Sequence, residues 1–204
     1  MLPVAALLVI LTSATAFGHA GGMDWTQQAK ELSGKAESDL AQWEALNKLM
    51  GDFSKKGEYD RAAGVAEKAL EVAKQSDFLG SVGAVGVSLC NLAGCYCNQS
   101  RYAQAEPLFQ SALAFYEKKF GPDYPPVAAI INNLGTVHER QGHLEQAESL
   151  YGRALKIDEK ALGPDHPNVA VALRNLAGIY RSTHRDEDAA KLEERAAAIE
   201  AIKR

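Results

Sequence analysis

Apolar residues follow a helical spacing over residues 144–162, where this stripe is the clearest in the chain. Its members lie three or four positions apart, or side by side, which places them on one face of an α-helix. They are Leu144, Ala147, Leu150, Tyr151, Ala154, Leu155 and Ile157. Gly142 separates this stripe from another over 127–141, and Gly163-Pro164 ends it, because glycine leaves a helix readily and proline does not continue one. The pattern predicts a pair of helices joined by a short turn.

The same pattern returns at a fixed interval along the chain. Asn91, Asn133 and Asn175 each begin an Asn-Leu-Ala or Asn-Leu-Gly triplet, and each lies 42 residues after the one before. A looser copy places Leu49 43 residues upstream of its counterpart Leu92. A period of this length indicates stacked helical units, none of which buries its apolar face alone. We therefore expect an all-α fold, an α-solenoid of about four stacked antiparallel helix pairs.

The helix pairs occupy most of the chain. Their expected boundaries as repeats are 44–80, 85–125, 126–167 and 168–204. Gly-Pro-Asp-Tyr-Pro at 121–125 and Gly-Pro-Asp-His-Pro at 163–167 close the second and third repeats, and Asp165 or Asn168 is expected to begin the helix that follows. No such linker separates the first two repeats. Their connection over 76–86 is rich in glycine, so we expect it to be looser.

An apolar run over residues 3–17 precedes the repeats and matches none of them. Its length suits the apolar core of a signal peptide and is short for a bilayer span, and small residues with Ala-x-Ala-like spacing follow it. We therefore predict export to the periplasm or the extracellular space, with residues 1–20 as the signal peptide. No Lys or Arg precedes the run, so an uncleaved inner-membrane anchor is the alternative. Residues 21–43 are expected to form a linker or leading helix, with Asp24 as its candidate N-cap.

Composition and charge exclude a role in nucleic-acid binding. Apolar residues make up 47% of the chain, which is enough for a packed core. The net charge of −4 and the pI near 5.8 come without clustered lysines or arginines. Binding to a phosphate backbone requires such a cluster, so no nucleic-acid partner is expected.

The residues that most often carry chemistry do not form a site. Cys90, Cys95 and Cys97 fall in one expected helix, and Cys90 and Cys97 would lie about 10 Å apart along its axis, beyond disulfide reach. His138 and His143 have one residue too many between them for the i, i+4 spacing of a zinc-binding helix. No nucleophile elbow, phosphate loop or dinucleotide motif occurs. The sequence predicts no enzyme, metal or cofactor, and a thiol-dependent redox protein is the weaker alternative.

The repeats resemble the tetratricopeptide repeat, a pair of antiparallel helices with small and large residues at fixed positions. In the third repeat these positions hold Ile131, Leu134, Gly135, His138, Ala147, Tyr151 and Ala154. The long period and the Gly-Pro-Asp linkers resemble the kinesin-light-chain subtype, over roughly residues 44–204. His138 replaces the usual tyrosine, and Glu193 stands where Phe109 and Tyr151 stood, so the last helix is expected to face water. The resemblance implies a protein-interaction scaffold with a peptide or protein partner, not a motor.

In this family the first helix of each pair lines a concave groove, and its positions that face away from the core contact the partner. Transferred to this sequence, the expected peptide-binding residues are Asn91, Asn132, Asn133, Arg174, Asn175 and Arg181. An asparagine amide matches the N–H and C=O of an extended peptide, and an arginine favours a carboxylate. The alternatives are that the asparagines hold the stack together and that the protein self-associates. Glycines recur at one equivalent position, either for close helix packing or to keep the groove floor open; they are Gly51, Gly94 and Gly178.

Overall fold

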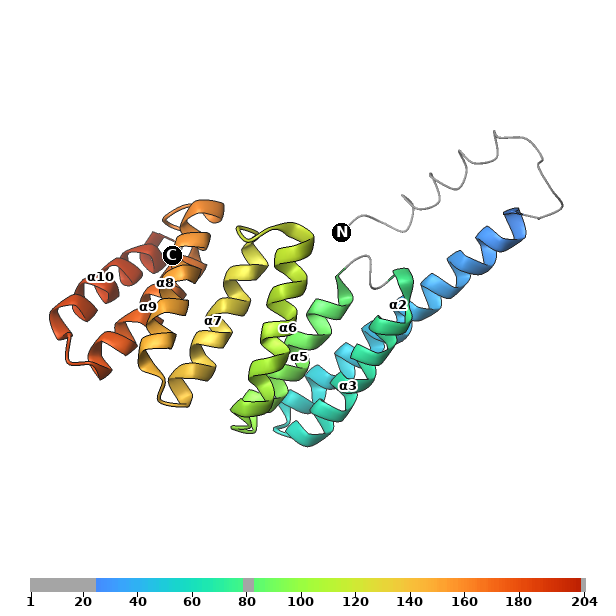
Figure 1. Ribbon diagram of the computed structural model, residues 1–204, viewed down its shortest axis with the longest axis horizontal. Helices are drawn as coiled ribbons and strands as arrows, with labels where there is room; N and C mark the ends of the chain where they lie inside the picture. Colours follow the sequence, from blue (N-terminus) through green and yellow to red (C-terminus); the bar gives the residue numbers. More distant parts are fainter. Residues whose placement is uncertain (1–24, 79–82, 203–204) are drawn as a thin grey trace.

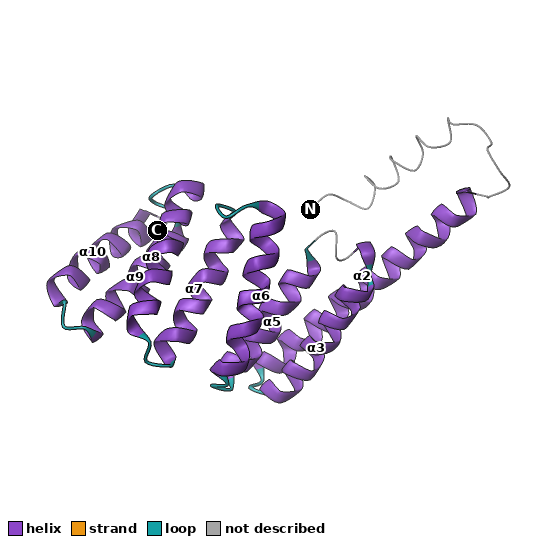
Figure 2. Cartoon of the chain, in the orientation of Figure 1, coloured by secondary structure: helices purple, strands orange, loops and turns teal. Residues whose placement is uncertain are grey.

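The computed structural model describes residues 25–78 and 83–202 of the chain. Within these ranges the chain forms helices joined by short turns (Figure 2). The helices are α2 (Trp25–Lys55), α3 (Tyr59–Gln75), α5 (Ala84–Asn98), α6 (Tyr102–Phe120), α7 (Pro125–Arg140), α8 (Leu144–Leu162), α9 (Pro167–Ser182) and α10 (Asp186–Ile202). None of these helices is both long enough and apolar enough to cross a bilayer. The expected signal peptide and the candidate N-cap Asp24 lie outside the described residues.

The helices pack as consecutive antiparallel pairs. α2 packs with α3, α5 with α6, α7 with α8, and α9 with α10. The second helix of each pair also packs on the first helix of the next pair, so that the pairs stand side by side from blue α2 to red α10 (Figure 1). The expected all-α array of about four stacked helix pairs is therefore confirmed.

Glycines end the helices where the sequence predicted turns. Gly121 and Gly163 follow α6 and α8 with φ angles of +91°, and Gly142 follows α7 with a φ of +82°. A Cβ is strained in this left-handed region, so glycine is the residue that ends these helices at least cost. The expected bounds 144–162 agree with α8 at both ends.

The start of α9 differs from the sequence expectation. Neither Asp165 nor Asn168 is its N-cap. His166 holds that position, and its Nδ1 accepts a 3.2 Å hydrogen bond from the backbone N–H of Asn168. The imidazole therefore satisfies one of the N–H groups that a helix start leaves without a partner.

The first helix, α2, is continuous across the expected boundary at residue 44. It has 31 residues, roughly twice the length of α5, α7 or α9. Trp43 ties its middle to the next pair, because its indole Nε1 donates a 2.8 Å hydrogen bond to the hydroxyl of Ser88 on α5. The earlier turns of α2 extend beyond α3 (Figure 1), and Leu32 on these turns is exposed. The leading segment and the first helix of the array are thus one helix.

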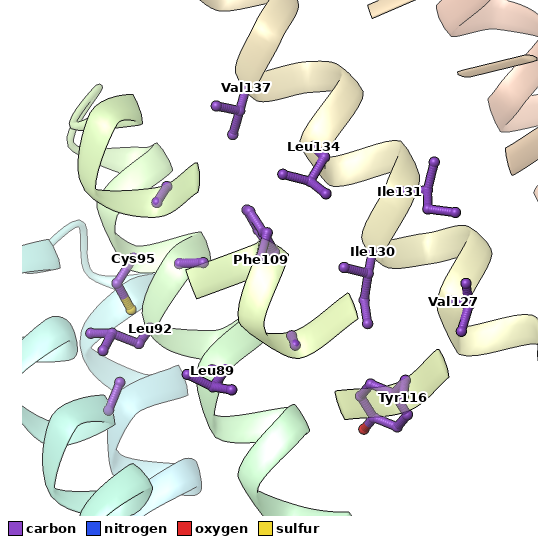
Figure 3. Packing of buried hydrophobic residues seen from close by; sticks show 14 of the residues in the cluster. Leu89, Leu92, Cys95, Phe109, Tyr116, Val127, Ile130, Ile131, Leu134 and Val137 are labelled. Carbon is purple, nitrogen blue, oxygen red and sulfur yellow. The ribbon is translucent and has the colours of Figure 1, made fainter. Parts of the chain in front are cut away.

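One leucine position shows how each pair depends on the pair before it. Leu92, Leu134 and Leu176 are all buried, and Figure 3 shows Leu134 on the side of α7 that faces Phe109 of α6. Leu49 occupies the same position in the first repeat, yet it is 43% exposed, compared with 4% for Leu134. No earlier repeat covers Leu49 within the described residues. The largest cluster of buried apolar residues runs from α3 to α8 and contains Leu92 and Leu134, whereas Leu176 lies in a separate cluster between α8 and α9. Burial at this position is incomplete at the first helix.

Candidate functional site

The outward sides of the first helices α2, α5, α7 and α9 form what we call the first-helix face. Val87, Ala129 and Val171 lie on it at intervals of 42 residues, and all three are exposed. Val171 is 52% exposed although it is a large apolar side chain. Each of three successive repeats thus presents an apolar side chain to solvent at one equivalent position.

Asparagine amides join neighbouring first helices at two junctions of this face. Asn91 Nδ2 on α5 donates a 2.7 Å hydrogen bond to Asn47 Oδ1 on α2. Asn175 Nδ2 on α9 donates a 2.9 Å hydrogen bond to Asn132 Oδ1 on α7. Three of the expected peptide-binding residues therefore bond within the array, and their amides help to hold adjacent repeats in register.

Asn133 departs from this arrangement. It occupies the position of Asn91 and Asn175, but the repeat before it has Cys90 where an asparagine accepts the bond at the other two junctions. The Asn133 side chain is exposed and has no hydrogen-bond partner in the described part of the chain. Its donor and acceptor groups are both available to a bound backbone.

The two expected arginines are already paired with carboxylates of α10. Arg174 donates to both oxygens of Glu200 at 2.8 and 2.6 Å, and Arg181 donates to both oxygens of Glu193 at 2.9 and 2.6 Å. A partner carboxylate would have to compete with these bidentate pairs.

The geometry gives Glu193 a partner that the sequence did not predict. Its hydrogen bonds from Arg181 lower the pKa of the carboxyl below its usual range. The side chain is 37% exposed, so the carboxylate pairs with Arg181 while it still reaches water. Where Phe109 and Tyr151 place a ring in their repeats, the last repeat has an ion pair.

The recurring glycines leave open space on the first-helix face. A Cβ built at Gly51, Gly94 or Gly178 would meet no other part of the protein within 4 Å, apart from its own helix and chain neighbours. Close packing of neighbouring helices therefore does not require these glycines. Close packing, the first of the two explanations drawn from the sequence, is therefore removed, and the explanation that is left is an open floor on this face.

The cysteines have the properties of inert thiols. All three are free and lie on α5, and Cys95 is buried. Burial raises the pKa of Cys90 to about 12, and it also raises the pKa values of Cys95 and Cys97. A thiol with a raised pKa holds little of the reactive thiolate at neutral pH. Across the described ranges, no group of three His, Cys, Asp or Glu side chains is placed to hold a metal ion.

The hydrogen-bond partners of the candidate asparagines lie one position outside the register of the repeats. Asn47 accepts from Asn91, and the two residues lie 44 positions apart, whereas the repeat period is 42 or 43. The bond joins a residue to the position after its equivalent in the next repeat. Two asparagines whose spacing is one residue longer than the repeat period are the signal in the sequence that indicates such a bond.

Comparison with known proteins supports the repeat assignment. The model of the tetratricopeptide repeat matches residues 85–160 and 144–199. Among solved structures, the chain is similar to BtubC (BKLC) from P. vanneervenii, with a TM-score of 0.70 and 24% identity over 79% of this chain and 64% of that one. The chain thus spans less than two thirds of the length of BtubC.

Two further structures share the fold. A Podospora anserina protein described as a kinesin light chain with nearly identical TPR-like repeats gives a TM-score of 0.64 at 19% identity, over 100% of this chain and 99% of that one. The apo form of RapI gives 0.68 at 15% identity, over 96% and 49%. No curated protein has a matching sequence.

Proposed function

The chain belongs to the tetratricopeptide repeat family, and we propose that it is a non-enzymatic scaffold that binds an extended segment of another polypeptide across its first-helix face. The observation that carries the proposal is the periodic pair of features on that face. An exposed apolar side chain recurs in three repeats, and an open glycine position lies two turns further along in two of them. Apolar contacts and accessible backbone together suit a polypeptide ligand.

The spacing of the helices fits an extended ligand. Packed helices lie roughly 8–10 Å apart, and an extended chain advances about 3.3 Å per residue, so about three ligand residues would span the distance from one packed helix to the next. Asn133 lies between Val87 and Val171 in the order of the repeats, and its free amide is matched to one peptide unit of such a segment.

The test begins with peptides selected from a displayed random library on the wild-type protein. Val171→Asp places a charge in the apolar row, and we expect it to weaken face-binding peptides by at least about tenfold. Leu32→Asp makes the same change at an exposed position of α2 away from this row and should leave their affinity unchanged. If no selected peptide distinguishes Val171→Asp from Leu32→Asp, the first-helix face is not the binding surface.

We also propose that the protein is exported. The support is the apolar run at 3–17 and the small residues after it. Amino-terminal sequencing of the protein from its native compartment should give a start near Phe17 or Gly21. An intact Met1 in the membrane fraction would instead support the alternative, an anchored assembly factor.

Self-association is the second candidate function, and the exposure of Leu49 favours it. This leucine has the position at which the later repeats bury theirs against the preceding pair. A second copy of the chain that covered α2 would bury it. Light scattering of the wild type and of Leu49→Glu tests this candidate, which requires an oligomer that the substitution dissociates.

A further inference from the structure

Two adjoining cavities lie along α8. The larger, of about 440 Å³, is lined by Glu148, Ser149, Gly152, Arg153 and Lys156 of α8 and by Leu176 and Tyr180 of α9. The smaller, of about 250 Å³, shares Arg153 and Lys156 and reaches Pro122, Asp123, Ile157 and Lys160. Because they share two residues, we treat the cavities as one site and call it the α8 cleft.

The α8 cleft is separate from the first-helix face. Leu176 and Tyr180 are one turn apart and share a side of α9. Arg174 and Gly178, which belong to the first-helix face, lie on the opposite side of that helix, two residues before each of them. A ligand in the cleft would therefore meet different residues from a peptide on the first-helix face.

Two residues of the cleft break the pattern of the repeats, and they lie one turn apart on α8. Gly152 and Lys156 stand where the neighbouring repeats have other side chains. At the first position these are Gln110 and Glu194, and at the second they are Ala114 and Ala198. A Cβ at Gly152 would meet nothing within 4 Å beyond its own helix. Glycine is unfavourable inside a helix, and packing does not require it at this position. At these two positions the third repeat combines an opening with an added cation on one helix face, and the second and fourth repeats do not.

Lys156 is the cation of the cleft that is available to a ligand. Arg153 is paired with Glu117, and Lys160 is paired with Asp123. Lys156 is exposed and has no ion pair or hydrogen bond in the part of the chain that the structure describes. Its ammonium attracts a carboxylate, and Leu176 supplies apolar surface in the same cavity.

The far wall of the cleft is held in place by a charged network. The guanidinium of Arg185 lies 3.9 Å from the centroid of the Tyr180 ring, and it donates to both oxygens of Glu148. These bonds lower the pKa of the Glu148 carboxyl, which stays ionised and engaged with Arg185. Because Glu148 is paired with Arg185, it does not neutralise Lys156. The same bonds fix the shape of the cleft beside the lysine.

We propose that the α8 cleft binds an acidic segment of a protein partner. One carboxylate of the segment pairs with Lys156, and a neighbouring apolar side chain fills the space above Gly152 against Leu176. The exposed hydroxyl of Ser149 is placed to donate a hydrogen bond to the same segment. The carboxylate belongs either to an Asp or Glu side chain or to a chain end.

Two substitutions restore the pattern of the repeats and test the site. Gly152→Gln refills the opening with the side chain of the preceding repeat, and Lys156→Ala removes the cation. Both replace a residue with one at least as favourable in a helix, so these variants should melt no lower than the wild type. Gly64→Gln and Lys68→Ala are the matched controls. They make the same changes one turn apart on α3, where a Cβ at Gly64 also meets open space.

The probe is the set of peptides selected from a displayed random library on the wild-type protein. We expect one class, with Asp or Glu beside a leucine-like residue, to lose affinity by at least about tenfold in each α8 variant and by less than about twofold in each control. Amidation of the peptide carboxyl end distinguishes a chain end from a side chain. The proposal is overturned if no acidic class emerges, or if its members bind the α8 variants and the wild type equally. Peptides on the first-helix face respond to Val171→Asp instead, so the two sites are judged independently.

Discussion

The ring of Tyr151 lies directly against Gly135. A Cβ built at residue 135 would fall 2.6 Å from Cε1 of that ring, which is closer than real Cβ atoms approach other atoms. Tyr151 is fully buried, and its hydroxyl donates a 2.7 Å hydrogen bond to Glu139 Oε2. The hydrogen bond of the hydroxyl holds the ring in place, and α7 and α8 approach each other closely because Gly135 has no side chain.

Gly135→Ala should destabilise the array, even though alanine stands at this position in the neighbouring repeats as Ala93 and Ala177. We expect a loss of about 1–3 kcal/mol, because the new methyl group overpacks a ring that has nowhere to move. Urea unfolding measures the change. Gly178→Ala is the control, since its Cβ meets open space and alanine favours a helix by about 1 kcal/mol. A Gly135→Ala variant as stable as this control would contradict the contact.

Leu134→Ala should lower the free energy of unfolding strongly, and the equivalent change Leu49→Ala should lower it only slightly. Leu134 is 4% exposed within the largest cluster of buried apolar residues, so we expect a loss of about 2–5 kcal/mol. The effect should extend into the flanking repeats, because stacked units stabilise their neighbours. Leu49→Ala removes a side chain that is 43% exposed and should cost less than about 1 kcal/mol. If chemical unfolding gives the same loss of stability for both variants, the stack does not bury Leu134 more than Leu49.

The bond between Asn132 and Asn175 should appear as a coupling energy. Each single alanine variant should lose about 0.5–1.5 kcal/mol, and the double variant should lose less than the sum of the two. A double-mutant cycle measured by urea unfolding gives the coupling. Strict additivity would show that the 2.9 Å hydrogen bond does not stabilise the stack.

Asp158 should make stability depend on pH in the direction opposite to most carboxylates. Burial raises the pKa of this carboxyl in the folded chain, while His166 and Asn168 act against the shift. The folded state is therefore favoured where Asp158 is neutral, and this contribution is lost as the pH rises through the folded pKa. Asp158→Asn should raise the melting temperature at pH 7 relative to the wild type, and this gain should vanish below pH about 3.8.

Asp188 provides the control for that pH dependence. Its pKa is lowered by the hydrogen bond from Lys191, so its contribution is present at neutral pH and is lost as the pH falls through the folded pKa. Asp188→Asn should therefore change stability with the opposite sign and only slightly, because the pair is exposed. A melting difference between Asp158→Asn and the wild type that does not vary with pH would exclude the role of burial.

The regular part of the fold follows from the sequence because each repeat gives its residues the same surroundings. The bounds of α8 and the turn at Gly163 were predictable for this reason. The boundary at residue 44 was not. The helix of the leading segment runs into the first repeat without a proline to stop it, and Gly34 and Gly51 sit within α2 without breaking it.

The sequence predicted which positions lie on the candidate binding face but not which of their side chains are already bonded within the array. Whether an asparagine forms a hydrogen bond to the preceding repeat depends on the residue one position earlier in that repeat. That residue is Asn47 for Asn91 but Cys90 for Asn133. The arginine pairs depend on the antiparallel register of α9 and α10, which places Glu200 beside Arg174 although 26 residues separate them. Helical periodicity gives the face of a residue but not its partner in the next helix.

The most direct test of the binding account compares Asn133→Ala with Asn175→Ala, using a selected peptide that is sensitive to Val171→Asp. Asn133 has no partner in the described array, so its loss should weaken the peptide by about tenfold while the melting temperature stays within about two degrees of the wild type. Asn175→Ala should lower the melting temperature, because it breaks a bond of the stack. If Asn133→Ala instead lowers the melting temperature by many degrees, or leaves peptide affinity unchanged, the first-helix face does not bind a polypeptide through this amide.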